Sequence, residues 1–246
     1  MSPTAMRSDC ITPSPRRVAV VLVSGLALAA LALFLDPPIA TFAQRLQPGG
    51  DIHLGGDVRR TIEWLQQFGD AATCLICAIC IWLLDPARRR DLPRALLALL
   101  GTWGVVQAIK MLAGRPRPRV VFGHPQPGFD AIVQFTPPWR AYPLPHTDHG
   151  VTTYVLQHAW TLGHGSDLWS FPSSHTSAAA ALAVVLSRLY PRLTPLVWFL
   201  VACVGVGRVV LGAHFPSDVI AGAAVGYAAA TLLFRPSPLA PQAPNT

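Results

Sequence analysis

Six long apolar runs constrain this chain more than any other feature of its sequence. Each run has about 16 to 20 residues, or ~24–30 Å as an α-helix, which approaches the thickness of a bilayer's hydrocarbon core. Only 13% of the residues are charged, about half the share of an ordinary soluble domain. The sequence therefore predicts an all-α fold, a bundle of six transmembrane helices over residues 18–35, 65–84, 95–114, 174–190, 195–211 and 219–234.

The net charge of +7 comes largely from arginines that stand in short segments beside the apolar runs. The positive-inside rule places such segments in the cytoplasm, so we do not expect nucleic acid as a partner. The expected organisation is a cytoplasmic tail (1–17), a membrane domain (18–235) and a disordered C-terminal tail (236–246). Within the membrane domain, residues 115–171 form a periplasmic insert or lid between the third and fourth helices.

The first run has two interpretations. Arg16-Arg17 before an apolar stretch is typical of a signal peptide and weakly of a twin-arginine signal. However, the run is longer than a usual signal core, and Asp36-Pro37-Pro38 is a poor cleavage site. An uncleaved anchor is therefore favoured, and cleavage would not change which face carries the polar motifs.

The predicted topology brings three polar motifs to one face of the membrane. Lys110 ends a run that travels outward and is followed by Arg117-Pro118. The segment 172–175 opens a run that travels inward, and Arg208 ends the next outward run, shortly before residues 214–218. Snorkelling at a helix end explains a lone cation, but it does not explain cations and histidines gathered on one face.

These residue types suit the transfer of a phosphoryl group. Lys110, Arg117 and Arg208 supply cations for the phosphoryl oxygens. Ser173 and Ser174 stand at a predicted helix start, where free backbone N–H groups bind anions.

Two histidines complete the pattern. His175 would lie beside an anion at this helix start. His214 and Asp218 are four residues apart, so the carboxylate is able to orient one imidazole nitrogen and leave the other free to attack phosphorus. Alternatively, Asp218 or Ser217 only caps the last helix, and the two roles are compatible.

The pattern Lys110-x6-Arg117-Pro118, Pro172-Ser173-Ser174-His175 and Arg208-x5-His214-x3-Asp218 resembles the signature of the type 2 phosphatidic acid phosphatase superfamily. The resemblance implies that His214 is the nucleophile that forms a phosphohistidine, with Asp218 as its orienter and His175 as general acid. It also implies that neither a metal nor another cofactor is needed. The residues that it assigns to phosphate binding are Lys110, Arg117, Ser173, Ser174 and Arg208.

Two positions depart from the family's usual pattern. Ser174 stands where the family usually has Gly, and Gly207 stands where it often has Ser. A side chain at position 174 would crowd the amide that contacts phosphate, whereas Gly207 lacks a hydroxyl but leaves every charged role filled.

Other potential ligand groups have simpler explanations. The spacing of Cys74, Cys77 and Cys80 suggests an iron–sulfur or zinc site, but the run has no polar flanks, so apolar packing is favoured. A metal site at His146-x-x-His149 has no accompanying carboxylate, so solvated loop histidines are favoured there.

The resemblance is greatest to the membrane branch of the superfamily, particularly bacterial phosphatidylglycerophosphate and undecaprenyl-diphosphate phosphatases. It implies a multi-pass lipid phosphatase of the bacterial inner membrane with its site facing the periplasm. The expected substrate is undecaprenyl diphosphate, phosphatidylglycerophosphate or phosphatidic acid. The alternatives are a lipid A phosphatase or lipid-to-lipid phosphotransferase, and a non-catalytic protein that binds anionic lipids.

Overall fold

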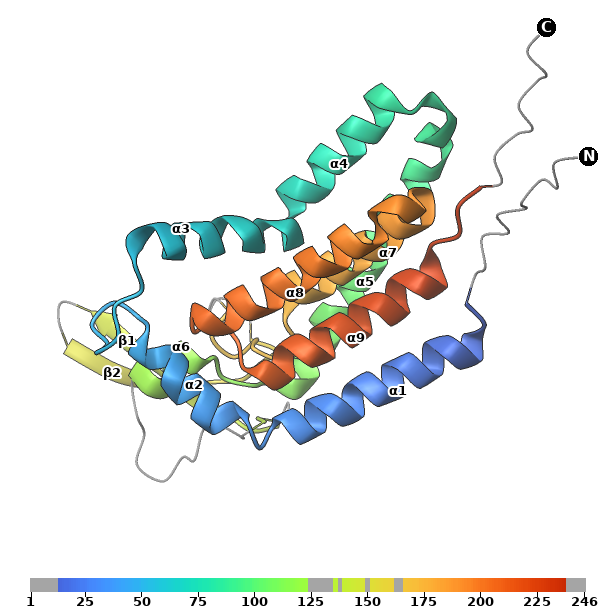
Figure 1. Ribbon diagram of the computed structural model, residues 1–246. Helices are drawn as coiled ribbons and strands as arrows, with labels where there is room; N and C mark the ends of the chain where they lie inside the picture. Colours follow the sequence, from blue (N-terminus) through green and yellow to red (C-terminus); the bar gives the residue numbers. More distant parts are fainter. Residues whose placement is uncertain (1–12, 124–134, 137–138, 149–150, 162–165, 238–246) are drawn as a thin grey trace, which may run out of the picture.

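The computed structural model describes residues 13–123, 135–136, 139–148, 151–161 and 166–237. Within these ranges the chain is mostly helical (Figure 1). Its elements in chain order are α1 (Pro15–Ala32), α2 (Asp36–Arg45), α3 (Gly56–Leu65), η1 (Gln66–Gly69), α4 (Ala71–Leu84), η2 (Pro86–Asp91), α5 (Leu92–Ala113), α6 (Pro118–Gly123), β1 (Tyr142–Asp148), β2 (Val151–Gln157), α7 (Ser174–Leu189), η3 (Pro191–Leu193), α8 (Thr194–Val210) and α9 (Pro216–Leu233).

Helix α7 forms the centre of the bundle. It packs against α5, α8, α9 and η1, and every residue from Ala179 to Leu186 is buried. Small residues on α9 allow the closest approach, because a Cβ added to Gly226 would lie 2.2 Å from the carbonyl oxygen of Ser177. Such contacts between small residues are a common way for helices to pack in lipid.

The outer surface of the bundle is strongly apolar. Val23 on α1, Leu97 on α5 and Phe199 on α8 are 65%, 62% and 62% exposed. Exposed apolar surface on this scale needs a nonpolar surrounding. Among the described residues, four helical stretches are long and apolar enough to cross a bilayer: Pro15–Ala32, Pro86–Phe122, Pro191–Val210 and Pro216–Leu233.

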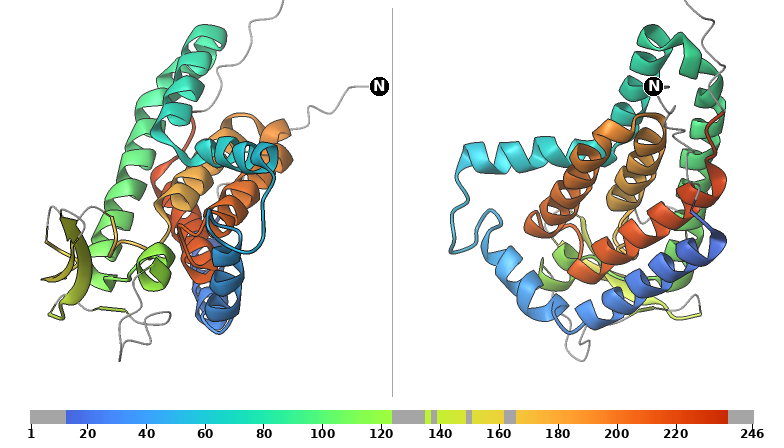
Figure 2. Two further views of the ribbon diagram at one scale, coloured as in Figure 1. Left: turned by 90° about the vertical axis from the view of Figure 1, so that its left-hand side faces the viewer. Right: turned by 45° about the vertical axis from the view of Figure 1, so that its right-hand side comes forward.

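A fifth span exists if α3 with η1 and α4 together make one crossing, which is bent by 62°. The bend is visible in Figure 1 and in the right-hand view of Figure 2. It occurs at Asp70, whose carboxylate caps α4 by accepting a hydrogen bond from the N–H of Ala72 at 3.3 Å. The single straight helix predicted over 65–84 is therefore wrong.

The structure supports four or five spans by length and composition, whereas six were predicted. The difference at α7 has a physical reason. This helix has 16 residues and is enclosed by its neighbours, so it needs neither the length nor the uniformly apolar surface of a helix that faces lipid.

The all-α prediction is wrong for the long insert, because β1 and β2 form an antiparallel hairpin beside α6 (Figure 1). Tyr142 and Leu144 on β1 are buried in a small cluster with Val120 of α6 and Leu168. The packing of alternate β1 residues on this cluster gives the hairpin its buried face. The role of the insert as a lid stays a prediction.

Several predicted features lie outside the described residues. They include His149 of the insert and most of both tails. The predicted site residues all lie within the described part of the chain.

Candidate active site

Four helix ends meet at one end of the bundle and bring the three motifs together. Lys110 lies in the last turn of α5, His175 in the first turn of α7, and Arg208 in the last turn of α8. The turn after α8 carries His214, and Asp218 lies in the first turn of α9. The backbone N–H of Ser173 donates to the carbonyl of Asp218 at 3.0 Å, which joins the second motif to the third.

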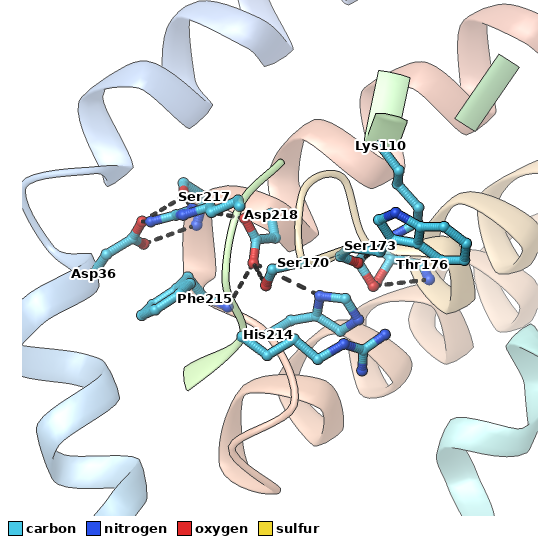
Figure 3. Close-up of polar contacts among 12 residues, drawn as sticks. Asp36, Lys110, Ser170, Ser173, Thr176, His214, Phe215, Ser217 and Asp218 are labelled. Atoms are coloured by element: carbon cyan, nitrogen blue, oxygen red, sulfur yellow. Dashed lines mark hydrogen bonds and ion pairs between the residues drawn. The ribbon is translucent and has the colours of Figure 1, made fainter. Parts of the chain in front are cut away.

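His214 faces Asp218 in a closed environment (Figure 3). The imidazole Nδ1 lies 3.6 Å from Asp218 Oδ2, and the two residues are 2% and 0% exposed. This separation is longer than a hydrogen bond, and Nδ1 has no other partner in the described part of the chain. Catalytic hydrogen bonds are often long before substrate binds.

The carboxylate of Asp218 also caps its helix. Its Oδ2 accepts hydrogen bonds from the backbone N–H of Phe215 at 2.9 Å and from Ser170 Oγ at 2.5 Å. Asp218 thus caps α9 and also lies beside His214, so helix capping and orientation of the imidazole are compatible.

Burial has the largest effect on the pKa of His214. The loss of solvent around the imidazole lowers its pKa well below 6.5, and the charges of Arg117 and Lys110 act in the same direction. The nearby Asp218 acts in the opposite direction but is outweighed. The free site therefore holds a neutral imidazole, the form that has a lone pair for attack.

The three predicted cations surround these histidines. Lys110 is 2% exposed and donates to the carbonyl of Trp169 at 2.5 Å, and it lies with Arg117 in electrostatic range of both imidazoles. One guanidinium nitrogen of Arg208 donates to Gln66 Oε1 at 2.9 Å, while its buried Nε has no partner among the described residues. A buried donor without an acceptor is suited to an incoming anion.

The start of α7 is built as predicted. Ser173 is the N-cap, and its Oγ accepts hydrogen bonds from the backbone N–H of Thr176 at 3.4 Å and from Thr176 Oγ1 at 3.0 Å. Ser174 is half-buried and lines an adjoining cavity. Position 207 faces α3, since a Cβ there would lie 3.2 Å from Ile62 Cγ2, so its glycine fits a helix contact.

The structure adds residues that the sequence motifs did not indicate. Arg115 is fully buried and donates to Asp218 Oδ1 at 2.6 Å and to Asp36 Oδ2 at 2.7 Å. Ser170 and Ser217 join the same network. The sequence held one weak signal for it, the isolated carboxylate of Asp36 directly after an apolar run.

An apolar cavity of about 900 Å³ lies between α4, α5 and α7. Ser174 and His175 line it together with apolar side chains such as Leu99 and Leu182. Trp82 and Arg89 also line it, and the Arg89 guanidinium lies 5.2 Å from the Trp82 ring centroid. The candidate site therefore adjoins an apolar space.

No cluster of three His, Cys, Asp or Glu side chains suited to a metal occurs in the described ranges. Cys74 and Cys77 are free thiols packed against the apolar core, as favoured from sequence, whereas Cys80 is an exposed free thiol. The pairing of His146 with His149 is untested, since His149 lies outside those ranges.

The sequence model of the PAP2 superfamily matches residues 91–239, which is more than half of the chain. The chain belongs to the PAP2 superfamily. Membership confirms the predicted resemblance to type 2 phosphatidic acid phosphatases. Together with the apolar helices of the chain, this membership identifies a multi-pass membrane protein of this phosphatase family.

Two solved structures share the fold. A transmembrane PAP2-type phosphatidylglycerolphosphate phosphatase from Bacillus subtilis superposes with a TM-score of 0.53 at 19% identity, over 88% of this chain and 93% of that one. LpxE from Aquifex aeolicus gives 0.52 at 16% identity, over 80% and 93%.

Curated relatives match over shorter segments. A lipid A 1-phosphatase from Rhizobium etli is 38% identical over 109 residues, which is 40% of this chain and 45% of that protein. A decaprenylphosphoryl-5-phosphoribose phosphatase from Mycobacterium tuberculosis is 40% identical over 57 residues, or 23% of this chain and 31% of that protein. The matches span less than half the length of these relatives.

Proposed function

We propose that this protein hydrolyses a phosphomonoester or diphosphate of a membrane lipid at the periplasmic face of a bacterial inner membrane. One observation carries the proposal: a buried His214–Asp218 pair lies among three cations, and His175 adjoins both this group and an apolar cavity. The cations suit a phosphate headgroup, and the apolar cavity suits an acyl or prenyl chain.

The geometry supports a two-step reaction. On substrate binding, Asp218 would accept a hydrogen bond from the Nδ1–H of His214, and Nε2 attacks phosphorus. A P–N bond forms as the bond from phosphorus to the leaving oxygen breaks, and His175, which is protonated once the phosphate anion is bound beside it, gives its proton to that oxygen. Water then attacks the phosphohistidine, His175 takes up the water's proton, and the P–N bond breaks to release phosphate and restore His214.

Lys110, Arg117 and Arg208 would stabilise the negative charge on the phosphoryl oxygens during both steps. Electrostatic stabilisation of this kind usually supplies the greater part of the rate enhancement in phosphoryl transfer. Because side chains supply the nucleophile, the acid and the cations, the proposed reaction needs no metal ion.

The apolar cavity supports a lipid rather than a soluble phosphate ester. It follows α7 from His175 to Leu186, a distance of about 17 Å at ~1.5 Å per helical residue. A hydrocarbon chain placed along this path would exchange lipid surroundings for apolar side chains, while the phosphate stays at the helix ends.

The test uses protein purified in detergent with a chelator present throughout. The substrate panel contains undecaprenyl diphosphate, phosphatidylglycerophosphate, phosphatidate and lipid A. We expect phosphate release from at least one lipid, and His214→Ala should reduce it by about 10⁴-fold or more. His53→Ala, at an exposed histidine between α2 and α3, should leave the rate unchanged.

Two results would contradict the proposal. Full activity in His214→Ala would exclude the nucleophile, and loss of wild-type activity on chelation would exclude the metal-free reaction. A non-catalytic lipid binder would form no covalent intermediate, whereas we expect labelled phosphate to be trapped on His214 of wild-type protein.

Lipid A is a specific second candidate among the substrates. Two relatives named lipid A 1-phosphatase are each 38% identical over their matched segments. Release of free phosphate from lipid A would support this assignment. Transfer of the label to a second lipid without release would instead identify a phosphotransferase.

A further inference from the structure

We infer that Asp36 and Arg115 are positioning residues for the catalytic pair. They hold Asp218 toward His214, so that the corner between α1 and α2 becomes part of the active-site structure. This inference rests on the proposed function, because it assigns the two residues a role in the reaction of that same site.

Arg115 contacts both carboxylates directly. Its NH1 donates to Asp218 Oδ1 at 2.6 Å and its NH2 donates to Asp36 Oδ2 at 2.7 Å. Ser217 lies between them, accepting from Arg115 NH1 at 2.7 Å and donating to Asp36 through both its backbone N–H, at 3.0 Å, and its hydroxyl. All four side chains are fully buried.

The arrangement fixes the plane of the Asp218 carboxylate. Oδ1 is held by Arg115, and Oδ2 is held by Ser170 and by the backbone of Phe215. The side of Oδ2 toward His214 Nδ1 is the direction left for the imidazole, as Figure 3 shows. Helix capping alone would need the contact with Phe215 but not a buried guanidinium.

The guanidinium is itself held in place by aromatic rings. Its central carbon lies 4.1 Å from the ring centroid of Phe215 and 5.1 Å from that of Phe135. Arginine suits this position because its planar fork binds two carboxylates while its faces stack on rings. The position of Arg115 is therefore set from several sides at once.

Charge gives Asp36 a role that packing alone does not. One guanidinium is shared by two buried carboxylates, so Asp218 keeps negative charge for His214. Without the charge of Asp36, Arg115 would neutralise Asp218 more completely, and a protonated or phosphorylated imidazole would be less stabilised. Lys110 and Arg117 also lie near His214 and oppose its protonation.

The test compares Asp36→Asn with Asp51→Asn, a control that removes an exposed carboxylate paired with Arg45 beyond the end of α2. We expect kcat to fall about ten- to a hundredfold in Asp36→Asn with little change in KM, as for other residues that orient catalytic groups. The acid limb of the kcat profile should also move to lower pH. Unchanged kcat and an unchanged profile would overturn the inference.

A double-mutant cycle separates positioning from folding. If Asp36 acts through Asp218, then Asp36→Asn should cost almost nothing further in the Asp218→Asn background. A full independent loss there would show a purely structural role. Should Asp36→Asn fail to fold, Ser217→Ala removes one link of the same network, and we expect about a fivefold loss in kcat.

A measurement without turnover distinguishes failure of this inference from failure of the proposed function. Nitrogen NMR of labelled histidine in detergent should show His214 protonated on Nδ1 in wild type and a mixture of tautomers in Asp36→Asn. The same tautomer in both proteins would overturn the inference even if the phosphatase is active. Inactive wild-type protein with the expected tautomer change would overturn only the proposed function.

Discussion

At the scale of single residues, Arg208 offers a buried hydrogen-bond donor that a bound phosphate group would satisfy. Its Nε is buried without an acceptor in the described structure, while its NH1 is held by Gln66. We expect Arg208→Gln to lower kcat/KM about 10²–10³-fold, the usual cost of losing one donor to transition-state charge. The matched control is Arg192→Gln, which changes an exposed arginine in η3, just before the opposite end of α8.

Steady-state kinetics on the preferred lipid would measure both variants. A loss below tenfold in Arg208→Gln, or an equal loss in Arg192→Gln, would show that the unpaired Nε does not receive the phosphoryl group. A rise in KM with constant kcat would instead mean that Arg208 binds the substrate and the transition state equally well.

The pH dependence of the reaction follows from the burial of His214. Its folded pKa is depressed below 6.5, so the neutral nucleophile persists in the folded protein as the pH falls through 6.5. We expect the acid limb of kcat/KM that reports His214 in the free enzyme to lie below pH 6.5. An acid limb at or above pH 6.5 that is assigned to His214 by NMR titration would contradict this.

The same shift affects stability. Below pH 6.5 the unfolded chain binds a proton at this imidazole and the folded chain does not, so His214 reduces stability as the pH falls toward its folded pKa. In His214→Asn this contribution is absent. The melting temperature of the variant should therefore fall less steeply than that of wild type between pH 7 and pH 5.

The site could be predicted from sequence only where its residues form short local patterns. Lys110, His175 and Asp218 each stand at a recognisable helix end, so their convergence followed from the topology. Arg115 and Asp36 are 79 positions apart, and neither has a neighbour that reveals the other. Their contact depends on how α2 turns back over the bundle, which no local periodicity encodes.

Helices were the most predictable elements. The extents of the apolar runs placed α5, α7, α8 and α9 within about three residues of their observed bounds, and α5 ends at Gly114 with φ of 58°. The bend at Asp70 was missed because a capped break inside an apolar run looks like a continuous helix. The hairpin was missed because β1 contains two prolines and β2 has no regular alternation of polar and apolar residues.

The contact between α7 and α9 leads to a prediction at this scale. Gly226→Ala would place a methyl group 2.2 Å from the carbonyl oxygen of Ser177, so the helices must separate. We expect a loss of about 1–3 kcal/mol in stability, as for other overpacked contacts. Gly104→Ala on α5 is the control, because a Cβ there meets nothing within 4 Å.

Thermal unfolding in detergent would compare these two alanine variants. A melting temperature for Gly226→Ala equal to that of Gly104→Ala would mean that the helix pair adjusts without cost. In that case the segment 172–175 and the segment 214–218 would not depend on close packing of α7 on α9 to stay together.

At the scale of the whole protein, the apolar cavity links the membrane to the chemistry. Ala178 of α7 lines it, so Ala178→Phe would fill part of the proposed chain path. We expect KM for a long-chain lipid phosphate to rise about tenfold or more, since bulk here displaces several methylene groups. Val206→Phe on the exposed surface of α8 should change neither constant.

A short soluble phosphate ester gives the internal comparison. Its kcat/KM should be the same in Ala178→Phe and wild type, because it does not enter the cavity. Equal losses for the ester and the lipid would instead indicate that the substitution disturbs His175 itself.

The enclosure of α7 also bears on how the protein is made. A helix of 16 residues with Ser, His and Thr in its first turn is a weak signal for the translocon on its own. It enters the bilayer favourably only when neighbouring helices accept its small, close-packed faces. We therefore expect stable insertion of α7 to depend on α8 and α9, which follow it in the chain and pack against it.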